Sequence, residues 1–481
     1  MGFRFKIALL STACTLLLQP AAAGDYTLPD IGTAGIRGIT IQREEQFGEY
    51  FIRMVRGNMN VVDDPVMNEY MRSVGNKLIM HADNVKFPFK FFVVNNPALN
   101  ASAFLGGVVT VYTGLFHYSD SVDEFASVIA HEISHVTQRH IARYIESMSA
   151  TTPLTVAGMI GSIVMSVINP AIGMAALSGT MGATVQSGIN FTRENEAEAD
   201  RIGIELLQRA GYNPGAMTDM FKKLLNLQGG SSSAAYAMLQ DHPLSQTRAS
   251  EAAARAAQFG RRKNSNSPDY EFARARTDVR FMNLDKPEEL KKRLEVNPER
   301  RSKYYRNYAL ALLCYELKEY GKAREYLSAL GMNNNIFIID LLTDLDLKGG
   351  NAQGAISRLN QAYGRMPYNE AVVINLANVL MKVGQHKRAI SILKKFTGKF
   401  PENTLALQML AESYLKTGDR CTALQTSGNL YALKASYNRA MNAYNEAMNT
   451  CTSSYSRDIT RALITRLGKQ RSFDEELSKG I

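Results

Sequence analysis

Tryptophan is absent from this chain, and cysteine and net charge are scarce. The 481 residues include only four cysteines, too few for disulfides to replace a hydrophobic core, and none has the spacing of a zinc–thiolate site. The net charge is only +10 and no recognition motif accompanies it, so we expect no nucleic-acid partner. A hydrophobic content of 45% is ordinary for a globular protein, and the length predicts two or three domains.

The first apolar run has the form of an export signal. Basic residues precede the run at 7–18, and three alanines at 21–23 offer a small-residue cleavage site. These features predict a cleaved signal peptide at 1–23 and an exported mature protein. An oxidising compartment permits one disulfide, for which we favour Cys421 with Cys451, and buried free thiols are the alternative.

A second apolar stretch lies inside the chain. Residues 147–192 carry no charge and are rich in glycine, alanine and methionine. The pair Asn169-Pro170 interrupts the stretch, and neither half reaches the roughly 20 strongly apolar residues that a membrane span requires. The alternatives are a transmembrane hairpin, buried core helices, or an apolar lid that contacts lipid or unfolded chains. We favour the lid or the core.

The pentapeptide 131–135 carries the strongest chemical signal. It has the form H-E-x-x-H, which places His131 and His135 one helical turn apart, so that both rings can reach one metal ion. Glu132 points away from that face and can take a proton from water at the open metal position. Ser121 offers a helix cap, and the apolar residues that follow recur at helical spacing. Two histidines that share this spacing by chance are the alternative.

The segment around the motif predicts a mainly helical fold with a small sheet, an α+β arrangement typical of zincin-like proteases. We expect helices at 44–56 and 65–82 and strands at 87–94 and 108–112. Strand 108–112 comes shortly before the H-E-x-x-H helix. It is therefore either an edge strand that pairs with an extended substrate or a plain core strand.

A third metal ligand is expected downstream. Glu196 and Asp200 lie four residues apart on a predicted helix and therefore share a face. Glu196 can complete a site of two histidines and one glutamate that leaves the fourth position to water, while Asp200 can orient His131 or His135. Glu198 is the rival ligand, but it lies only two residues from Glu196 and points elsewhere.

The C-terminal half contains alanines that recur with a period near 34 residues, each after a turn-like stretch. These residues are Ala323, Ala355, Ala389 and Ala423. Small residues at helix crossings with this period are typical of tetratricopeptide repeats, an α-solenoid whose concave surface binds other proteins. We therefore predict a zinc protease domain at 24–259, followed by a linker and repeat domain at 260–481.

H-E-x-x-H followed by E-x-x-x-D resembles the gluzincin metalloproteases, which include the CAAX prenyl endopeptidases and the HtpX-type membrane proteases. The resemblance implies one zinc ion (Zn2+) per subunit, with His131, His135 and Glu196 as ligands. It also implies Glu132 as the base and Asp200 in support of the ligands.

The export signal and the repeats narrow the resemblance to periplasmic gluzincins that control the quality of outer-membrane β-barrel proteins. It covers essentially the whole mature chain. It implies a periplasmic location, unfolded or misassembled outer-membrane proteins as substrates, and the β-barrel assembly machinery as the partner of the repeats. Separately, the net positive charge is consistent with peripheral contact with an anionic membrane, and an ordinary solvated surface is the alternative.

The sequence at 241–248 has the H-P-x-x-x-x-R form that follows the metal-binding helices in these families. His242 and Arg248 near the metal could stabilise the oxyanion of a tetrahedral intermediate. Alternatively, His242 binds zinc in place of water and holds the enzyme latent, or it only shapes a loop. His140 is expected to face away from the histidine pair and to lie on the surface.

We therefore predict an exported zinc metalloendopeptidase that degrades misassembled outer-membrane proteins and assists their assembly. The alternative is a repeat-based periplasmic chaperone or adaptor whose zinc site is structural or dormant. The intact Glu132 favours the enzyme, because a structural zinc site does not need that carboxylate.

Overall fold

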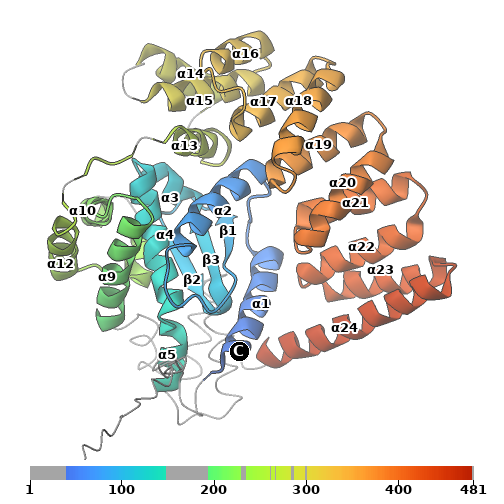
Figure 1. Cartoon of the computed structure of the whole chain (residues 1–481), viewed down its shortest axis with the longest axis horizontal. Coiled ribbons are helices and arrows are strands. Elements are labelled where there is room, and N and C mark those ends of the chain that lie inside the picture. The colour runs from blue at the N-terminus through green and yellow to red at the C-terminus, as the bar shows by residue number, and fades with distance from the viewer. Residues whose placement is uncertain are drawn as a thin grey trace, which may run out of the picture.

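The computed structural model of the chain is mainly helical, with one three-stranded sheet (Figure 1). It describes residues 39–147, 193–228, 235–260, 262–265, 267–282, 286–297 and 301–478. The predicted signal peptide and all but the first residue of the uncharged stretch therefore lie outside the described residues. Among the helices within these ranges, none is long and apolar enough to cross a membrane.

The N-terminal half supplies the sheet and the helices around it. The helices are α1 (Ile41–Asn58), α2 (Pro65–Ile79), α3 (Thr113–Tyr118), α4 (Val122–Thr137), α5 (His140–Ser147), α9 (Arg193–Arg209), α10 (Ala216–Gln228), α11 (Tyr236–Asp241) and α12 (Gln246–Ala257). The predicted helices at 44–56 and 65–82 correspond to α1 and α2. The mainly helical class with a small sheet is therefore confirmed.

The sheet has the strand order β1-β3-β2. β1 (Lys90–Val94) runs parallel to β3 (Val108–Tyr112), and β2 (Ala101–Phe104) runs antiparallel on the other side of β3. The predicted edge role of 108–112 is therefore wrong, because neighbouring strands already pair with both sides of its backbone. β2, for which the sequence carries no clear strand pattern, packs against α4.

Helix α4 forms the centre of this half, and all its residues are buried. The Ser121 hydroxyl accepts a hydrogen bond from the Glu124 amide at 3.1 Å, which caps the first turn as the sequence predicted. Helix α9 packs closely along α4. At the crossing, a side chain on Gly203 would place its Cβ 3.3 Å from the backbone nitrogen of His131. Glycine therefore lets α9 approach the H-E-x-x-H segment.

The C-terminal half is a succession of helices that curves around the first half (Figure 1). These helices are α13 (Pro268–Arg280), α14 (Pro287–Val296), α15 (Lys303–Glu316), α16 (Tyr320–Ser328), α17 (Ile336–Lys348), α18 (Ala352–Arg365), α19 (Glu370–Lys382), α20 (His386–Lys399), α21 (Thr404–Lys416), α22 (Arg420–Leu433), α23 (Tyr437–Thr450) and α24 (Ser454–Ser478). The four alanines of the 34-residue period are all buried, one each on α16, α18, α20 and α22. Close helix pairing through small residues explains the period.

The predicted disulfide between Cys421 and Cys451 is present, and it links the first turn of α22 to the end of α23. Cys314 is a buried free thiol on α15. The bridge closes the helix pair from which α24 departs.

A buried arginine joins the two halves at the beginning of the repeats. Arg276 on α13 donates to Asp64, which caps α2, at 2.6 Å, and to Asp340 on α17 at 2.7 Å. All three side chains are almost fully buried. An ion pair of this kind holds its partners in one geometry, because a single buried charge is strongly unfavourable.

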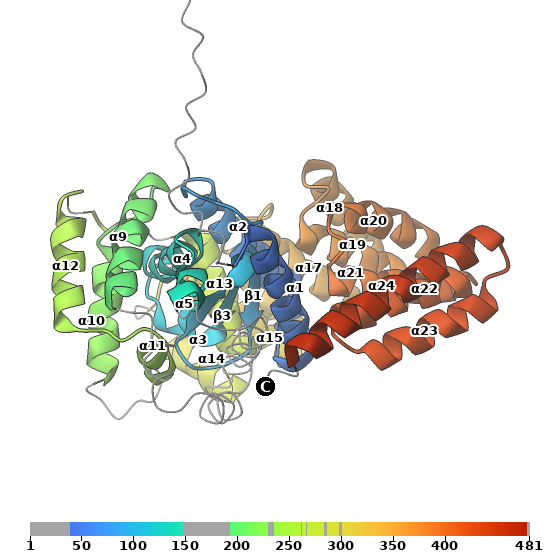
Figure 2. The same ribbon diagram turned by 90° about the horizontal axis from the view of Figure 1, so that it is seen from below.

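The last helix joins the halves a second time. Helix α24 has 25 residues, against 13 or 14 in each of α19 to α23, and it runs back toward α1 (Figures 1 and 2). Arg53 on α1 donates to Asp474 from Nε at 2.9 Å, and the Tyr437 hydroxyl donates to the same carboxylate. Near the end of α24, Leu477 is fully buried in a cluster with Phe47 and Phe51 of α1.

We expect Asp474→Asn to weaken this second junction strongly. It leaves the Arg53 guanidinium buried without its anion, a change that costs about 3–5 kcal/mol in comparable pairs. The measurement is thermal unfolding together with the rate of proteolysis within α24. Asp458→Asn is the matched control, because Asp458 pairs with Arg461 at an exposed position on the same helix, where pairs contribute less than about 1 kcal/mol. Equal effects of the two variants would contradict the assignment.

Candidate metal centre

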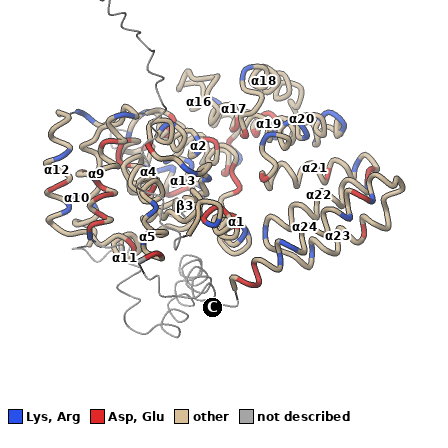
Figure 3. The backbone as a smooth tube through the Cα atoms, turned by 60° about the horizontal axis from the view of Figure 1, so that its bottom comes forward, with Lys and Arg blue, Asp and Glu red and all other residues tan. Residues whose placement is uncertain are grey.

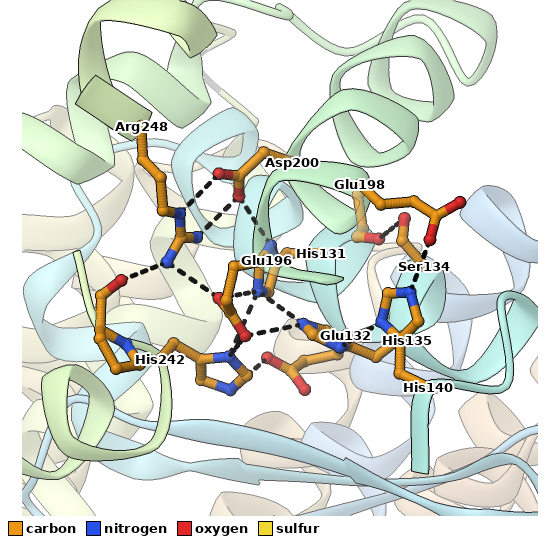
Figure 4. A network of polar contacts seen from close by, with 12 residues as sticks. His131, Glu132, Ser134, His135, His140, Glu196, Glu198, Asp200, His242 and Arg248 are labelled. Atoms are coloured by element: carbon orange, nitrogen blue, oxygen red, sulfur yellow. Dashed lines mark hydrogen bonds and ion pairs between the residues drawn. The ribbon is translucent and has the colours of Figure 1, made fainter. Parts of the chain in front are cut away.

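Four buried side chains converge between α4, α9 and the loop that follows α11 (Figure 4). The Nε2 atoms of His131 and His135 lie 3.0 Å apart. His242 Nδ1 lies 3.3 Å from His131 Nε2 and 3.1 Å from Glu196 Oε1, and His135 Nε2 lies 3.5 Å from the same oxygen. One ligand atom from each side chain thus lies within 4.8 Å of all the others.

These distances fit a tetrahedral zinc ion. Zinc bonds of about 2.0–2.1 Å at tetrahedral angles separate neighbouring ligand atoms by about 3.3 Å. The four separations above run from 3.0 to 3.5 Å. Three imidazoles and one carboxylate are also a donor set that zinc prefers. The residues present therefore fit the metal that the motif predicts.

Glu132 lies beside this cluster without belonging to it. Its side chain is buried, and its Oε1 has no hydrogen-bond partner among the described residues. This oxygen lies 3.4 Å from His242 Nε2. Burial raises the pKa of the Glu132 carboxyl. A carboxyl with a raised pKa holds a proton more firmly, as a general base requires.

Asp200 and Arg248 contact the side chains of the ligand cluster and hold them in position. Asp200 Oδ1 lies 3.0 Å from His131 Nδ1, and Arg248 contacts both oxygens of Asp200 at 2.8 and 2.9 Å. Arg248 Nη1 also lies 2.9 Å from Glu196 Oε2 and donates to the Pro243 carbonyl at 2.7 Å. Arg248 is thus directed at the carboxylates and the loop, and this geometry does not favour the predicted contact with an oxyanion.

Burial and neighbouring charges shift the pKa values of these groups, considered without the ion. Burial would lower the pKa of His131, but hydrogen bonds to Asp200 and Glu196 outweigh it and raise the pKa to about 10. Burial would raise the pKa of Glu196, yet the charge of His242 and bonds from both histidines hold it well below its usual value. A metal ion must therefore displace a proton from His131, so metal binding should strengthen as the pH rises.

The position of His140 contradicts the sequence analysis. It is completely buried, and its Nδ1 lies 2.8 Å from His135 Nδ1. Its Nε2 contacts Glu198 at 3.1 Å, and burial lowers the pKa of its ring to about 4. Helical spacing predicted a surface position, but α4 ends at Thr137 and the chain turns before His140. Glu198, as expected, is not part of the ligand cluster.

A largely apolar cavity adjoins His131. Val128 of α4 and Met217, Met220 and Phe221 of α10 line it, and it is small, with about 20 Å³ open to the centre of a water molecule. The segment that carries His242 completes the wall. No sequence motif marks this cavity, because its residues come from three separate segments of the chain.

Two histidines one helical turn apart, a glutamate from a second helix and a free carboxylate beside them define the class of the metallopeptidases. Comparison with known proteins supports the same class. The model of Peptidase family M48 matches residues 65–256, and a tetratricopeptide repeat model matches residues 346–396.

Relatives of similar length support a narrower assignment. The Beta-barrel assembly-enhancing protease of Escherichia coli (strain K12) is 40% identical over 385 residues, which cover 78% of each protein. The Putative beta-barrel assembly-enhancing protease of Vibrio cholerae is 37% identical over 87% of each. The Mitochondrial metalloendopeptidase OMA1 of Arabidopsis thaliana is 35% identical over 32% of this chain and 29% of its own length. The chain belongs to the family of β-barrel assembly-enhancing proteases. The predicted metalloprotease class is therefore confirmed.

Proposed function

We propose that this protein is an exported zinc endopeptidase of the periplasm that degrades misassembled outer-membrane β-barrel proteins and assists their assembly. The observation that carries the proposal is the cluster of His131, His135, Glu196 and His242 beside Glu132. The name of its bacterial relatives supports the substrate class and a location in the cell envelope. The repeats are the surface for partners, among them the β-barrel assembly machinery.

In this proposal His131, His135 and Glu196 hold the zinc ion. When bound, zinc supplies a Lewis acid that lowers the pKa of a water molecule and polarises a peptide carbonyl. Glu132 takes the proton of the attacking water and passes it to the leaving amine. Asp200 and Arg248 keep His131 and Glu196 in place through the contacts described above.

The same geometry supports a latent state that His242 holds. Its Nδ1 occupies the fourth corner of the ligand set, where water must bind for catalysis, and its Nε2 faces Glu132 at 3.4 Å. One side chain thus blocks both the water position and the base. His242 lies just after α11, so a movement of this loop would free both groups at once.

The apolar cavity is too small for a side chain while the His242 loop is closed, but its wall would lie next to the scissile bond once the loop moves. Its wall includes Met217, Met220 and Phe221, and Leu244 from the His242 loop contributes to the same lining. Unfolded outer-membrane strands carry apolar side chains in alternation, and such side chains would contact this apolar wall. Movement of the loop would therefore enlarge the cavity as it opens the metal.

Removal of the metal tests this proposal. We expect the purified protein to contain one zinc ion per chain and to lose cleavage of an unfolded outer-membrane protein when a chelator removes it. Zinc added back should restore cleavage, because the ligand set remains intact. Elemental analysis and a gel-based cleavage assay measure the two quantities. Full cleavage by protein that contains no metal would contradict the proposal.

The closed site favours a second candidate function, a repeat-based chaperone or adaptor with a dormant zinc site. In the described arrangement His242 lies 3.4 Å from the base and takes the fourth position of the ligand cluster. Complementation separates the two functions. If Glu132→Gln restores every defect of a strain that lacks the protein, the chaperone function is sufficient; if it restores none or only some, proteolysis is required.

A further inference from the structure

His135 and His140 face each other through their Nδ1 atoms, which lie 2.8 Å apart (Figure 4). The opposite nitrogen of His140, Nε2, lies 3.1 Å from Glu198 Oε2. Arg143 donates to the same oxygen at 2.9 Å. A continuous chain of polar contacts therefore runs from Glu198 through His140 to one of the two histidines of the motif.

The carboxylate of Glu198, at the end of this series of contacts, determines where the hydrogens of the two imidazoles lie. A carboxylate only accepts, so the proton of a neutral His140 must lie on Nε2, where Glu198 can accept it. His140 Nδ1 is then without a proton and can accept from His135 Nδ1. The proton of His135 is thereby fixed on Nδ1, and its Nε2 keeps the lone pair that faces His131 and the ligand cluster.

The turn between α4 and α5 explains why His140 lies here. Arg139 has a left-handed backbone with φ of 54°, which reverses the chain directly after α4. Its buried guanidinium donates to Glu44 at 2.7 Å and to the Ile39 carbonyl at 2.7 Å. These contacts with α1 and the residue before its cap hold the reversed turn, so His140 points back at His135.

We propose that His140 and Glu198 are positioning residues that fix the tautomer and ring orientation of His135 for metal binding. The inference rests on the proposed metal site and extends it. His131 receives the same support directly from Asp200, whereas His135 receives it through a second imidazole. Helix α9 would thus supply three carboxylates with separate tasks, since Glu196 is the ligand and the other two orient the histidines.

The test compares His140→Phe with His140→Asn. Phenylalanine keeps most of the volume but cannot accept a hydrogen bond, while the asparagine amide oxygen can take the place of Nδ1. We expect His140→Phe to weaken zinc affinity about 10–100-fold, the range seen for other supporting partners of metal ligands. We expect His140→Asn to stay within a few-fold of the unmodified protein. Chelator competition measures affinity, and the visible absorption of the cobalt-substituted protein reports the ligand geometry.

Glu198→Ala provides a second test that does not alter the buried ring. Glu198 is partly exposed, so the variant should fold, and loss of its carboxylate should change the cobalt spectrum and lower zinc affinity. Unchanged affinity and spectrum in this variant would overturn the inference, as would equal losses in His140→Phe and His140→Asn. His81→Phe, the same exchange at an exposed histidine, should have no effect.

His131→Phe separates failure of the inference from failure of the proposed site. It removes a ligand and should abolish tight zinc binding. If it does so while His140→Phe binds zinc normally, only the positioning role of His140 and Glu198 is wrong. If His131→Phe itself binds zinc like the unmodified protein, the proposed metal site is wrong.

Discussion

Glu132→Gln should retain zinc and lose about 10²–10⁴-fold in the rate of peptide cleavage, the usual contribution of a general base. The exchange preserves the volume of a buried side chain and removes only its ability to take a proton. Glu132 is not among the four ligand side chains, so the metal content should stay at one per chain. A steady-state cleavage assay with an unfolded outer-membrane protein and elemental analysis give the two values.

The control for this variant is Glu205→Gln. Glu205 is a partly exposed glutamate on α9, outside the ligand cluster. The Glu205→Gln variant should cleave the substrate at the normal rate. Normal cleavage by Glu132→Gln would show that another group activates the water, and loss of zinc from it would show that Glu132 supports the metal instead.

His242→Ala should raise cleavage by about 10–100-fold, if the competent state of the resting enzyme amounts to a few per cent or less. The reason is that the variant frees both the fourth metal position and Glu132. His242 lies 3.1 Å from the ligand Glu196 and 3.4 Å from Glu132. The measurement is the cleavage rate at saturating zinc, so that any weaker metal binding does not mask the gain.

This variant also decides between the two roles that the sequence leaves open for His242. An oxyanion donor would contribute to the transition state, and its removal would lower the rate about 10²–10³-fold. If His242 is instead a fourth ligand that holds a latent state, its removal would raise the cleavage rate. His81→Ala, at an exposed histidine, is the control and should leave the rate unchanged.

Most of the fold and the centre of the site could be predicted because the determinants are local. His131 and His135 share a face wherever their segment is helical, and the apolar residues around them recur at helical spacing. Glu196 and Asp200 could be recognised together because they are also one turn apart. The repeat domain follows from alanines at a fixed period, since each helix pair meets the same packing requirement.

The features that could not be predicted depend on contacts between distant segments. Helical periodicity predicts a surface position for His140 only if α4 continues past Thr137, and α4 ends there. The place of 108–112 in the centre of the sheet depends on β2, a four-residue strand without a clear pattern. Likewise, nothing near Asp474 reveals its pairing with Arg53, which lies 421 residues away in the chain.

The most direct test of the central claim is zinc X-ray absorption on the full-length protein and on His242→Ala. The account predicts nitrogen and oxygen ligands at about 2.0–2.1 Å, with three imidazoles in the unmodified protein and two in the variant. Two imidazoles in both proteins would show that His242 does not bind the metal. Sulfur ligands, or no bound zinc, would contradict the proposed centre altogether.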